Sequence, residues 1–559
     1  MPIVPSTLRA GTRDLPVVPP LAQYLIGYFL GPILAWVDMA LMRRVLTRCT
    51  DHPLVQLAQL YDPAAVVAAC AAYYHADGTK GTPPTFSVDL LVRAEIVRTW
   101  ADSCSDRDLE WHLTTNLLVR WFVGLPLLAS APDHSTLARF HAWLAQHQSA
   151  TLFDDVLHFL DRNDPEDAAT TPQIVDTFAV ESPAAWSPRV ANLLLDLCAD
   201  LIAAWLTHAP PTLQRALPPL DLGPILHPRR PRDARERQAL LVQAATLAQR
   251  LLVDLTPHHL ALPADVRARI RSLTDAIAKV LADELQFDAA GDPTERTAKG
   301  DYRIISATDI EATFRKHDDD LTLGYNVALA TSATRIRAVV VATGATPDSE
   351  TPILLAQQQL AAKQPLPPYY IMDRAGGWGK CRARVDVVSG GQTRMVAHIP
   401  PAGGSDPDRF GPADFQVDPE RTTCICPNGL TSTKAYASGD GDGMHFRFLA
   451  SQCRACPLWN RCRGAEGNPK GHRTVFVSDY HAYLRQAAAF NQTAQGQALL
   501  SQRWMVEPTI AWLVRYQGCR RARRIGQAAA QCQLFQACAL RNLLLWLSRI
   551  RRGLARRPA

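Results

Sequence analysis

An aspartate inside an apolar run is the feature that most constrains this chain. Asp176 lies in the run 174–180 (Ile-Val-Asp-Thr-Phe-Ala-Val), and Asp373 ends a second run, 369–373 (Tyr-Tyr-Ile-Met-Asp). Short runs of β-branched and aromatic residues are typical of strands. A charged side chain inside such a strand is costly unless it is paired or bound to a metal. Each run therefore predicts a strand whose carboxylate is paired or binds a metal.

A third carboxylate, Glu507, lies at the start of a long helical pattern in Arg503-Trp-Met-Val-Glu507-Pro508. Two aspartates on strands and a glutamate on a helix can converge on a pair of divalent cations, which activate an attacking oxygen and stabilise a leaving one. Mg²⁺ suits such ligands because it prefers hard oxygen atoms and retains exchangeable waters. Each acid alone has a simpler interpretation: Asp176 as an edge-strand residue, Asp373 as a turn cap and Glu507 as a helix-dipole partner.

The order of the strand patterns predicts the fold class. A strand at 173–180 is followed by an apparent hairpin at 321–331 and 335–343, a helix at 349–362, and strands at 368–373 and 393–399. We therefore expect an α/β protein with a ribonuclease-H-like mixed sheet and flanking helices. Chemistry gathers at strand ends in such sheets, and Asp373 ends its strand.

Helical patterns dominate the rest of the chain. Short helices within 81–165, with a break at Gly124-Leu-Pro126, are typical of a helix-turn-helix arrangement whose helix 136–146 would enter the major groove. An ordinary helical bundle is the alternative. Residues 153–170 read as an acidic linker, and 188–290 as an almost wholly helical insertion without a strand signal. The uncharged stretch 21–37 is interrupted by Gly31-Pro32, which favours a buried hairpin over a membrane anchor.

Five of the thirteen cysteines fall between Cys424 and Cys462. Cys453 and Cys456 have the two-residue spacing of zinc knuckles, and Cys426 and Cys462 complete a set of four thiolates. Cys424 is a spare thiol and His445 a weaker candidate ligand. Such a site would be structural, because four thiolates leave no open position; reduced cysteines without a metal are the alternative.

Arginines accumulate at the C-terminal end. From Arg515 to Ala559 there are eleven arginines, no lysine and no acidic residue. A segment of one sign predicts contact with a phosphate backbone, whereas the alternative is a solvated helix with a frayed tail.

We expect eight segments in chain order. They are a helical segment 1–80, a helical DNA-binding domain 81–165, the first core strand 166–187, a helical insertion 188–300, the continued catalytic core 301–420, a zinc-ribbon-like module 421–469, C-terminal core helices 470–547 and a basic tail 548–559.

Three stretches together resemble bacterial insertion-sequence transposases of the DDE type. The N-terminal stretch runs from Ser105-Asp-Arg-Asp-Leu-Glu110 to Pro132-Asp-His-Ser-Thr-Leu-Ala-Arg139-Phe140. The second runs from Thr308-Asp309 to Leu323-Gly-Tyr325. The third is Arg503-x3-Glu507-Pro508 with Gln517-Gly-Cys-Arg-Arg-Ala-Arg523, Gly526 and Asn542. The cysteine pattern also recurs in one branch of this group.

This resemblance implies that Asp176, Asp373 and Glu507 are catalytic ligands of Mg²⁺ or Mn²⁺. It implies a transposase that cleaves element ends and joins the 3′-hydroxyl to target DNA. The partners would be double-stranded DNA and further copies of the chain, with no membrane, in the bacterial cytoplasm at the nucleoid. The candidate DNA-binding residues are Arg139, Arg503, Arg515, Arg520, Arg521, Arg523 and Arg524.

The chain departs from a related signature at two positions, where Leu500 replaces a tyrosine and Val514 a lysine. The departures put contacts with the DNA ends, and activity, in question. Two alternatives therefore stay open: an inactive, sequence-specific DNA-binding protein derived from a transposase, and a nuclease that cuts without joining.

Overall fold

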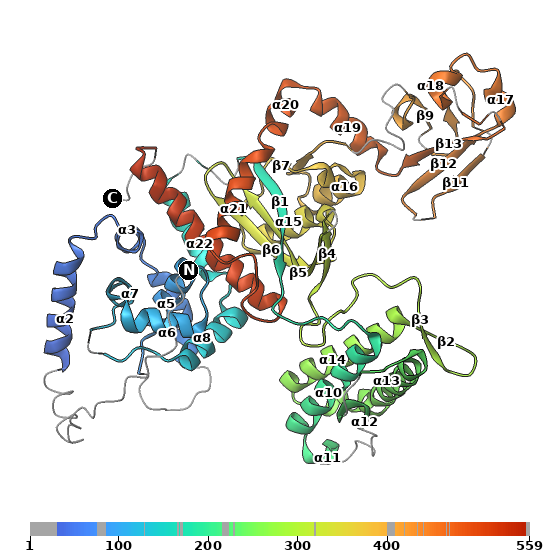
Figure 1. The fold of residues 1–559 in the computed structure, drawn as a ribbon. Coiled ribbons are helices and arrows are strands. Elements are labelled where there is room, and N and C mark those ends of the chain that lie inside the picture. The colour runs from blue at the N-terminus through green and yellow to red at the C-terminus, as the bar shows by residue number, and fades with distance from the viewer. Residues whose placement is uncertain are drawn as a thin grey trace. The chain divides into compact units, whose positions relative to one another are not determined.

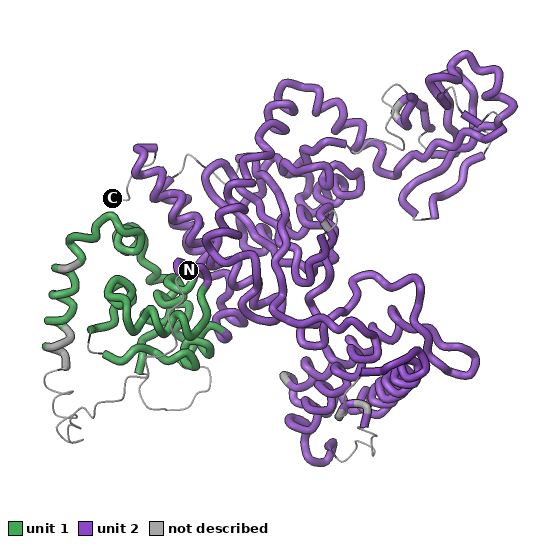
Figure 2. The backbone as a smooth tube through the Cα atoms, viewed as in Figure 1, with its two compact units in different colours: residues 1–98, 104–141 green, residues 99–103, 142–559 purple. Residues whose placement is uncertain are grey.

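The computed structural model describes residues 31–74, 85–127, 129–164, 167, 171–214, 223–226, 230–317, 320–399, 409–418, 420–432, 434–439, 441–464, 467–468 and 470–554. Most of the stretch 21–37 lies outside these residues. The chain divides into two compact units, residues 1–98 with 104–141 and residues 99–103 with 142–559 (Figure 2).

The first unit is helical. Its elements are α2 (Gly31–Leu46), α3 (Pro53–Leu60), α4 (Ala64–Ala69), η2 (Cys70–Tyr74), α5 (Val88–Trp100), α6 (Asp106–Thr115), α7 (Leu117–Val123) and α8 (His134–His147). Ser105 caps α6 by accepting a hydrogen bond from the Asp108 N–H, as its sequence predicts. Gly124 ends α7 in the left-handed conformation that glycine tolerates best.

A mixed sheet of six strands forms the centre of the second unit (Figure 1). Its strands are β1 (Gln173–Glu181), β4 (Thr313–His317), β5 (Asp320–Thr331), β6 (Ile336–Thr343), β7 (Tyr369–Ile371) and β8 (Arg394–Val396). The order is β4-β5-β1-β7-β8, with β6 also paired to β5. β7 is parallel to β1 and to β8, while β5 is antiparallel to its neighbours. Every strand expected in the core is present.

Helices cover the sheet. α15 (Thr351–Ala361) and α16 (Gly379–Val388) contribute Ile353, Leu355 and Val385 to one buried cluster, while α20 (Ala494–Leu500) contributes Leu499 to another. The remaining C-terminal elements are α19 (His481–Asn491), η7 (Arg503–Val506), α21 (Glu507–Tyr516) and α22 (Gln527–Arg551).

Side-chain amides satisfy the outer edge of β6. Asn542 on α22 accepts from the Ile336 N–H at 2.8 Å and donates to the Ile336 carbonyl at 2.9 Å. Gln531 accepts from the Val341 N–H at 2.7 Å and donates to the Val339 carbonyl at 2.9 Å. An unpaired strand edge invites pairing with another chain, so these amides close it.

The expected acidic linker 153–170 is largely the helix α9 (Thr151–Asn163). Its apolar face accounts for the difference, because Phe153 and Phe159 pack against Phe535 and Trp546 of α22 at ring distances of 5.6 and 5.4 Å.

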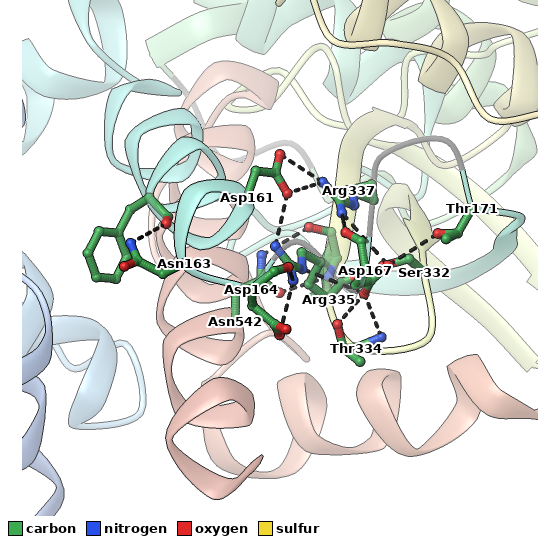
Figure 3. Close-up of polar contacts among 12 residues, drawn as sticks. Asp161, Asn163, Asp164, Asp167, Thr171, Ser332, Thr334, Arg335, Arg337 and Asn542 are labelled. Atoms are coloured by element: carbon green, nitrogen blue, oxygen red, sulfur yellow. Dashed lines mark hydrogen bonds and ion pairs between the residues drawn. The ribbon is translucent and has the colours of Figure 1, made fainter. Parts of the chain in front are cut away.

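The acids of this segment are paired rather than solvated. Asp161 binds Arg335 and Arg337 at 2.9 and 2.7 Å (Figure 3). Asp167 also pairs with both arginines, and Asp164 pairs with Arg335. Both arginines are 2% exposed in their side chains. Buried charges of this kind must be paired, so the network fixes α9 to the β5–β6 hairpin.

The insertion has its own core. It contains α10 (Val190–His208), α11 (Pro211–Gln214), α12 (Gly223–Leu226), α13 (Ala234–Leu255), η3 (Thr256–Ala261) and α14 (Ala264–Glu284). A short hairpin, β2 (Leu285–Phe287) with β3 (Pro293–Glu295), corrects the expectation of a region without strands. α10 and the stretch Ala234–Ala261 are long and apolar enough to cross a membrane, as is the bent pair Pro53–Leu60 with Ala64–Tyr74 if it counts as one span. In α10 and α13 the apolar residues pack into the insertion core.

The cysteine-rich module is larger than its expected limits of 421–469. Its packed cluster begins at Phe410 and ends at Val477. The strands are β9 (Gln416–Val417), β10 (Cys424–Ile425), β11 (Lys434–Ala437), β12 (Gly443–Phe448) and β13 (Arg473–Ser478), with helices α17 (Ala450–Arg454) and α18 (Trp459–Arg463) and the turn η6 (Pro412–Asp414).

Candidate active site

The register of two parallel strands brings the two aspartates together. Ile174 of β1 pairs with Ile371 of β7. Asp176 lies two residues beyond this pair on β1, and Asp373 lies two residues beyond it, just after β7. The charge of Asp373 acts on the Asp176 carboxyl, so the two side chains lie close to each other. Sequence alone gave no such register, because the two residues lie in runs far apart in the chain.

Both aspartates are on the same face of the sheet. Side chains alternate along a strand, so Asp176 shares the face of Ile174, and Asp373 shares that of Ile371. These two isoleucines pack in one buried cluster with Val506. The cluster therefore lies directly beside the acid pair.

Glu507 follows Val506 and begins α21. Because Val506 is fully buried against the strands that carry the aspartates, its neighbour is held at the edge of the same cluster. The Glu507 side chain is 57% exposed and accepts a hydrogen bond from Arg503 at 3.3 Å.

The electrostatics of Asp176 place the three acids near one another. Burial raises the pKa of the Asp176 carboxyl above its ordinary value, and the charges of Asp373 and Glu507 raise it further. A hydrogen bond from the Thr177 N–H and the charge of Arg503 act in the opposite direction. Like charges held together disfavour ionisation, which a cation would relieve.

The donor set fits a hard divalent cation, because it consists of carboxylate oxygens only. Asp373 keeps one oxygen for the Ala375 N–H at 2.9 Å, which orients the carboxyl at the start of the turn η5 (Arg374–Gly377). Within the described residues, however, no group of three or more His, Cys, Asp or Glu side chains is already arranged to hold a metal ion. The three acids therefore lie near one another without forming a ready-made metal site.

The arginines after Glu507 have different surroundings. Arg515 and Arg520 are exposed, whereas Arg521 pairs with Glu181 at the end of β1 at 2.8 Å. Arg523 donates to the Asp102 carbonyl at 2.9 Å. The loop is also held by backbone bonds of Glu181 to Arg520 and Ala522, so part of the expected DNA-binding set anchors the loop to β1.

The two remaining DNA-binding candidates are Arg524 and Arg139. Arg524 is half-buried. Arg139 is exposed on α8 and donates to the Thr136 hydroxyl at 3.3 Å. α8 covers the expected recognition helix 136–146, and its role in DNA binding stays a prediction.

The four candidate zinc ligands line one small cavity, together with Phe415 and Phe448 among others. They are Cys426, Cys453, Cys456 and Cys462. Burial and the neighbouring thiols raise the pKa of Cys453. Cys426 Sγ accepts from the Leu430 N–H at 3.4 Å. Cys424 is fully buried in the module core, and His445 stacks with Tyr436 at 5.2 Å.

Two tryptophans beside the acids were not among the expected site residues. Trp504, 61% exposed, lies between Arg503 and Glu507. Trp378, 58% exposed, ends the turn that begins after Asp373. The sequence did contain a sign of Trp378: it is an indole that follows Asp373 closely, at the end of a Gly-rich turn.

Two family matches cover separate parts of the chain. Residues 43–142 match the family described as "Transposase domain (DUF772)", and residues 425–545 match that described as "Transposase DDE domain". The second match contains Glu507 and the four candidate zinc ligands, while Asp176 and Asp373 lie before it. No curated protein and no solved structure matches the chain.

A DDE domain defines a polynucleotidyl transferase that depends on divalent metal, and the matched pair of domains defines an enzyme of DNA transposition. The chain is a transposase with a DUF772 N-terminal domain and a DDE catalytic domain, of the insertion-sequence transposase family. Binding to DNA follows from this class.

Proposed function

We propose that this transposase cleaves the ends of an insertion sequence and joins the 3′-hydroxyl to target DNA, with Asp176, Asp373 and Glu507 as its catalytic metal ligands. The core would be ribonuclease-H-like, since β1, β7 and β8 are parallel and β5 is antiparallel to β1. The observation that supports the proposal is the pairing of Ile174 with Ile371, two residues before Asp176 and Asp373, together with Val506 packed in the same cluster as these isoleucines.

Divalent cations at this site would supply Lewis-acid activation of the attacking oxygen and neutralise charge on the leaving oxygen. Mg²⁺ is the proposed ion, with Mn²⁺ as a substitute. Asp176 on β1 and Asp373 just after β7 would hold the ions in position, and Glu507 would approach from α21. Arg503 orients the Glu507 carboxyl through their hydrogen bond.

Two displacements at phosphorus would occur in sequence. Water attacks the phosphodiester at the element end, a P–O bond forms, and the bond to the 3′-oxygen breaks. The released 3′-hydroxyl then attacks a target phosphodiester and displaces another 3′-oxygen. The second step exchanges one phosphodiester for another, so it requires no external energy source.

The double-stranded DNA would be held by exposed arginines, including Arg515, Arg520 and Arg139, and by the helical domain. Arginine forks suit phosphate oxygens. Because two ends must be joined, we propose a dimer or larger assembly on DNA, acting at the nucleoid in the bacterial cytoplasm.

The four clustered thiols are proposed to hold a structural Zn²⁺. Soft thiolates select zinc, and four of them line a single cavity. Zinc content measured by mass spectrometry should be about one per chain and should fall in Cys453→Ser. Cys424→Ser is the matched control, because Cys424 lies in the packed core rather than among the ligands. Unchanged zinc in Cys453→Ser, or a metal-free wild type, would contradict the site.

The catalytic proposal is tested with DNA that carries the matched element ends. Asp373→Asn and Glu507→Gln should each lower Mg²⁺-dependent strand cleavage by about 10²-fold or more, with DNA binding largely retained. A strand-transfer assay separates joining from cutting alone. Wild-type cleavage in either variant removes that residue from the site, and no nicking by the wild type would favour an inactive DNA-binding protein.

A further inference from the structure

A second cavity lies where the turn after Asp373 meets the cysteine-rich module. It has a volume of about 450 Å³ and is lined by Trp378, which follows η5, and by residues of α16, η6, β13 and α19 among others. This volume falls in the range of about 300–1,000 Å³ typical of small-molecule sites. Neither the acid cluster nor the thiol cluster contributes to its lining.

Aromatic rings form its walls. Trp378 is 58% exposed and Phe476 36% exposed, and Tyr480 and Phe410 also line the cavity. Exposed indole and phenyl rings leave a large apolar area in water, and such rings are the stacking surfaces on which proteins hold unpaired bases.

Glycine shapes the junction. A Cβ added at Gly379 would lie 2.5 Å from the Cβ of Tyr480. Gly379 therefore allows the start of α16 to approach the start of α19 closely. The packing is completed by the Tyr483 hydroxyl, which donates to Asp386 of α16 at 2.9 Å.

The polar part of the cavity suits an anion. Lys380, Arg473 and His481 line it with one carboxylate, Asp442. The Nε of Arg473 is buried and makes no hydrogen bond among the described residues. Trp378 precedes the ten-residue helix α16 without capping it through its side chain, so the positive end of the helix and Lys380 both favour a phosphate.

We propose that this cavity binds one unpaired nucleotide of the DNA strand, with the base between Trp378 and the other aromatic rings and the phosphate at Lys380 and the start of α16. A base stacked inside a duplex cannot enter such a cavity, so the nucleotide must leave the stack. The proposal rests on the proposed function for the identity of the strand. Its position follows from the short turn between Asp373 and Trp378, since only the four residues 374–377 separate them, and this sets the nucleotide close to the cleavage site.

The test uses the full-length protein in EDTA and two fluorescent probes, a duplex with a short unpaired oligothymidine extension and the same duplex without it. Trp378→Ala should weaken binding of the extended probe about tenfold and leave the blunt duplex within about twofold. Trp378→Phe should restore most of the loss, because it keeps an aromatic face. Trp186→Ala is the matched control: this indole is 57% exposed and packs on Phe314 of β4.

A second variant tests the phosphate. Lys380→Gln should reduce the slope of log Kd against log salt by about one for the extended probe. Equal binding of both probes by Trp378→Ala and wild type would overturn the proposal. So would a loss in Trp378→Phe as large as that in Trp378→Ala, since it would indicate a packing role.

The outcome is separable from that of the proposed function. Asp373→Asn should bind the extended probe as the wild type does while it loses cleavage. Normal cleavage by Asp373→Asn together with the Trp378 effect would refute the catalytic assignment alone. Lost cleavage with no Trp378 effect would refute the nucleotide site alone.

Discussion

At the scale of single residues, the candidate carboxylates Asp373 and Glu507 lie near enough to Asp176 for their charges to act on it. Asp176 was identifiable because an ionised group in an apolar strand needs a reason to be there. The closeness of Asp373 to Asp176 was not predictable in detail, because the pairing of Ile174 with Ile371 depends on how distant strands align. The surroundings of Arg521 and Arg523 were also beyond reach: their partners Glu181 and Asp102 lie hundreds of residues earlier in the chain.

Asp176 should destabilise the fold when it is ionised and no metal is bound. Its folded-state pKa is raised by burial, Asp373 and Glu507, so the folded state binds the proton more tightly than the unfolded state does. The penalty is therefore present above the folded pKa and disappears as the pH falls below the unfolded value. We expect Asp176→Asn to raise Tm in EDTA at neutral pH, with the gain vanishing in acid.

Thermal unfolding followed across pH measures this effect, with Asp320→Asn on the exposed start of β5 as the control. The same Asp176→Asn protein should have lost cleavage, because an amide is a poor ligand for Mg²⁺. A lower Tm than wild type at neutral pH would show that the carboxylate makes stabilising contacts instead.

The helical first unit contains a buried ion pair in which the pKa of the carboxyl is lowered, the opposite of the shift at Asp176. Burial raises the pKa of Glu95, but the charges and hydrogen bonds of Arg98 and His141 outweigh it and hold the value at about 2. Stability from this group is therefore present above the unfolded pKa and is lost as the pH falls towards 2. Glu95→Gln should destabilise the unit by about 3–5 kcal/mol at neutral pH, because it removes the buried counter-charge of Arg98 and leaves only the more exposed Asp106 to pair with it.

Denaturant unfolding at neutral and acidic pH checks this prediction. Asp89→Asn is a suitable control, since Asp89 pairs with Arg93 on the surface of the same helix, and such pairs contribute about 0–1 kcal/mol. An equal effect of the two variants, or an undiminished Glu95→Gln effect in acid, would contradict the buried-pair account.

At the scale of elements, the strands and most helices were predictable from periodicity, whereas their exceptions have tertiary causes. The run 153–170 looked like a linker because of its acids, but its apolar positions pack on α22 and its acids bind Arg335 and Arg337. The hydrogen bonding of the β6 edge likewise depends on tertiary contacts. Gln531 and Asn542 appear in the sequence as polar residues in an apolar helix, and only the structure shows that they complete a strand.

Gln531→Leu should therefore lower the stability of the protein more than the small change in side-chain size suggests. It leaves the Val341 N–H and the Val339 carbonyl without their partners at a buried edge. An unsatisfied buried group costs about 1–3 kcal/mol, so we expect a loss of about 2 kcal/mol or more in the free energy of unfolding. Gln536→Leu on the same helix is the control, since its amide meets only Cys532 Sγ at 3.8 Å among the bonds found in the described residues. Equal losses of unfolding free energy in the two variants would show that Gln531 does not stabilise the protein through the β6 edge.

At the scale of the whole molecule, the two ends of the insertion lie close to each other. The Ser187 N–H donates to the Ile305 carbonyl at 2.9 Å, and the Ser182 hydroxyl donates to Asp309 at 2.6 Å. The chain thus leaves the core after β1 and returns beside its point of departure. The helical composition of 188–300 indicated an insertion, but this closeness of its ends could not be inferred from composition.

Because its ends meet and its apolar residues form one cluster from Val190 to Ala307, the insertion should fold alone. Residues 188–307 expressed separately should give a helical circular dichroism spectrum and a cooperative thermal transition, as expected of a domain with its own core. The complementary protein, in which a short Gly-Ser linker replaces residues 188–304, should keep the paired strands and bind duplex DNA, because no catalytic carboxylate is removed. A non-cooperative transition in the fragment, or aggregation of the shortened protein with loss of its sheet signal, would mean that the insertion core and the catalytic sheet stabilise each other.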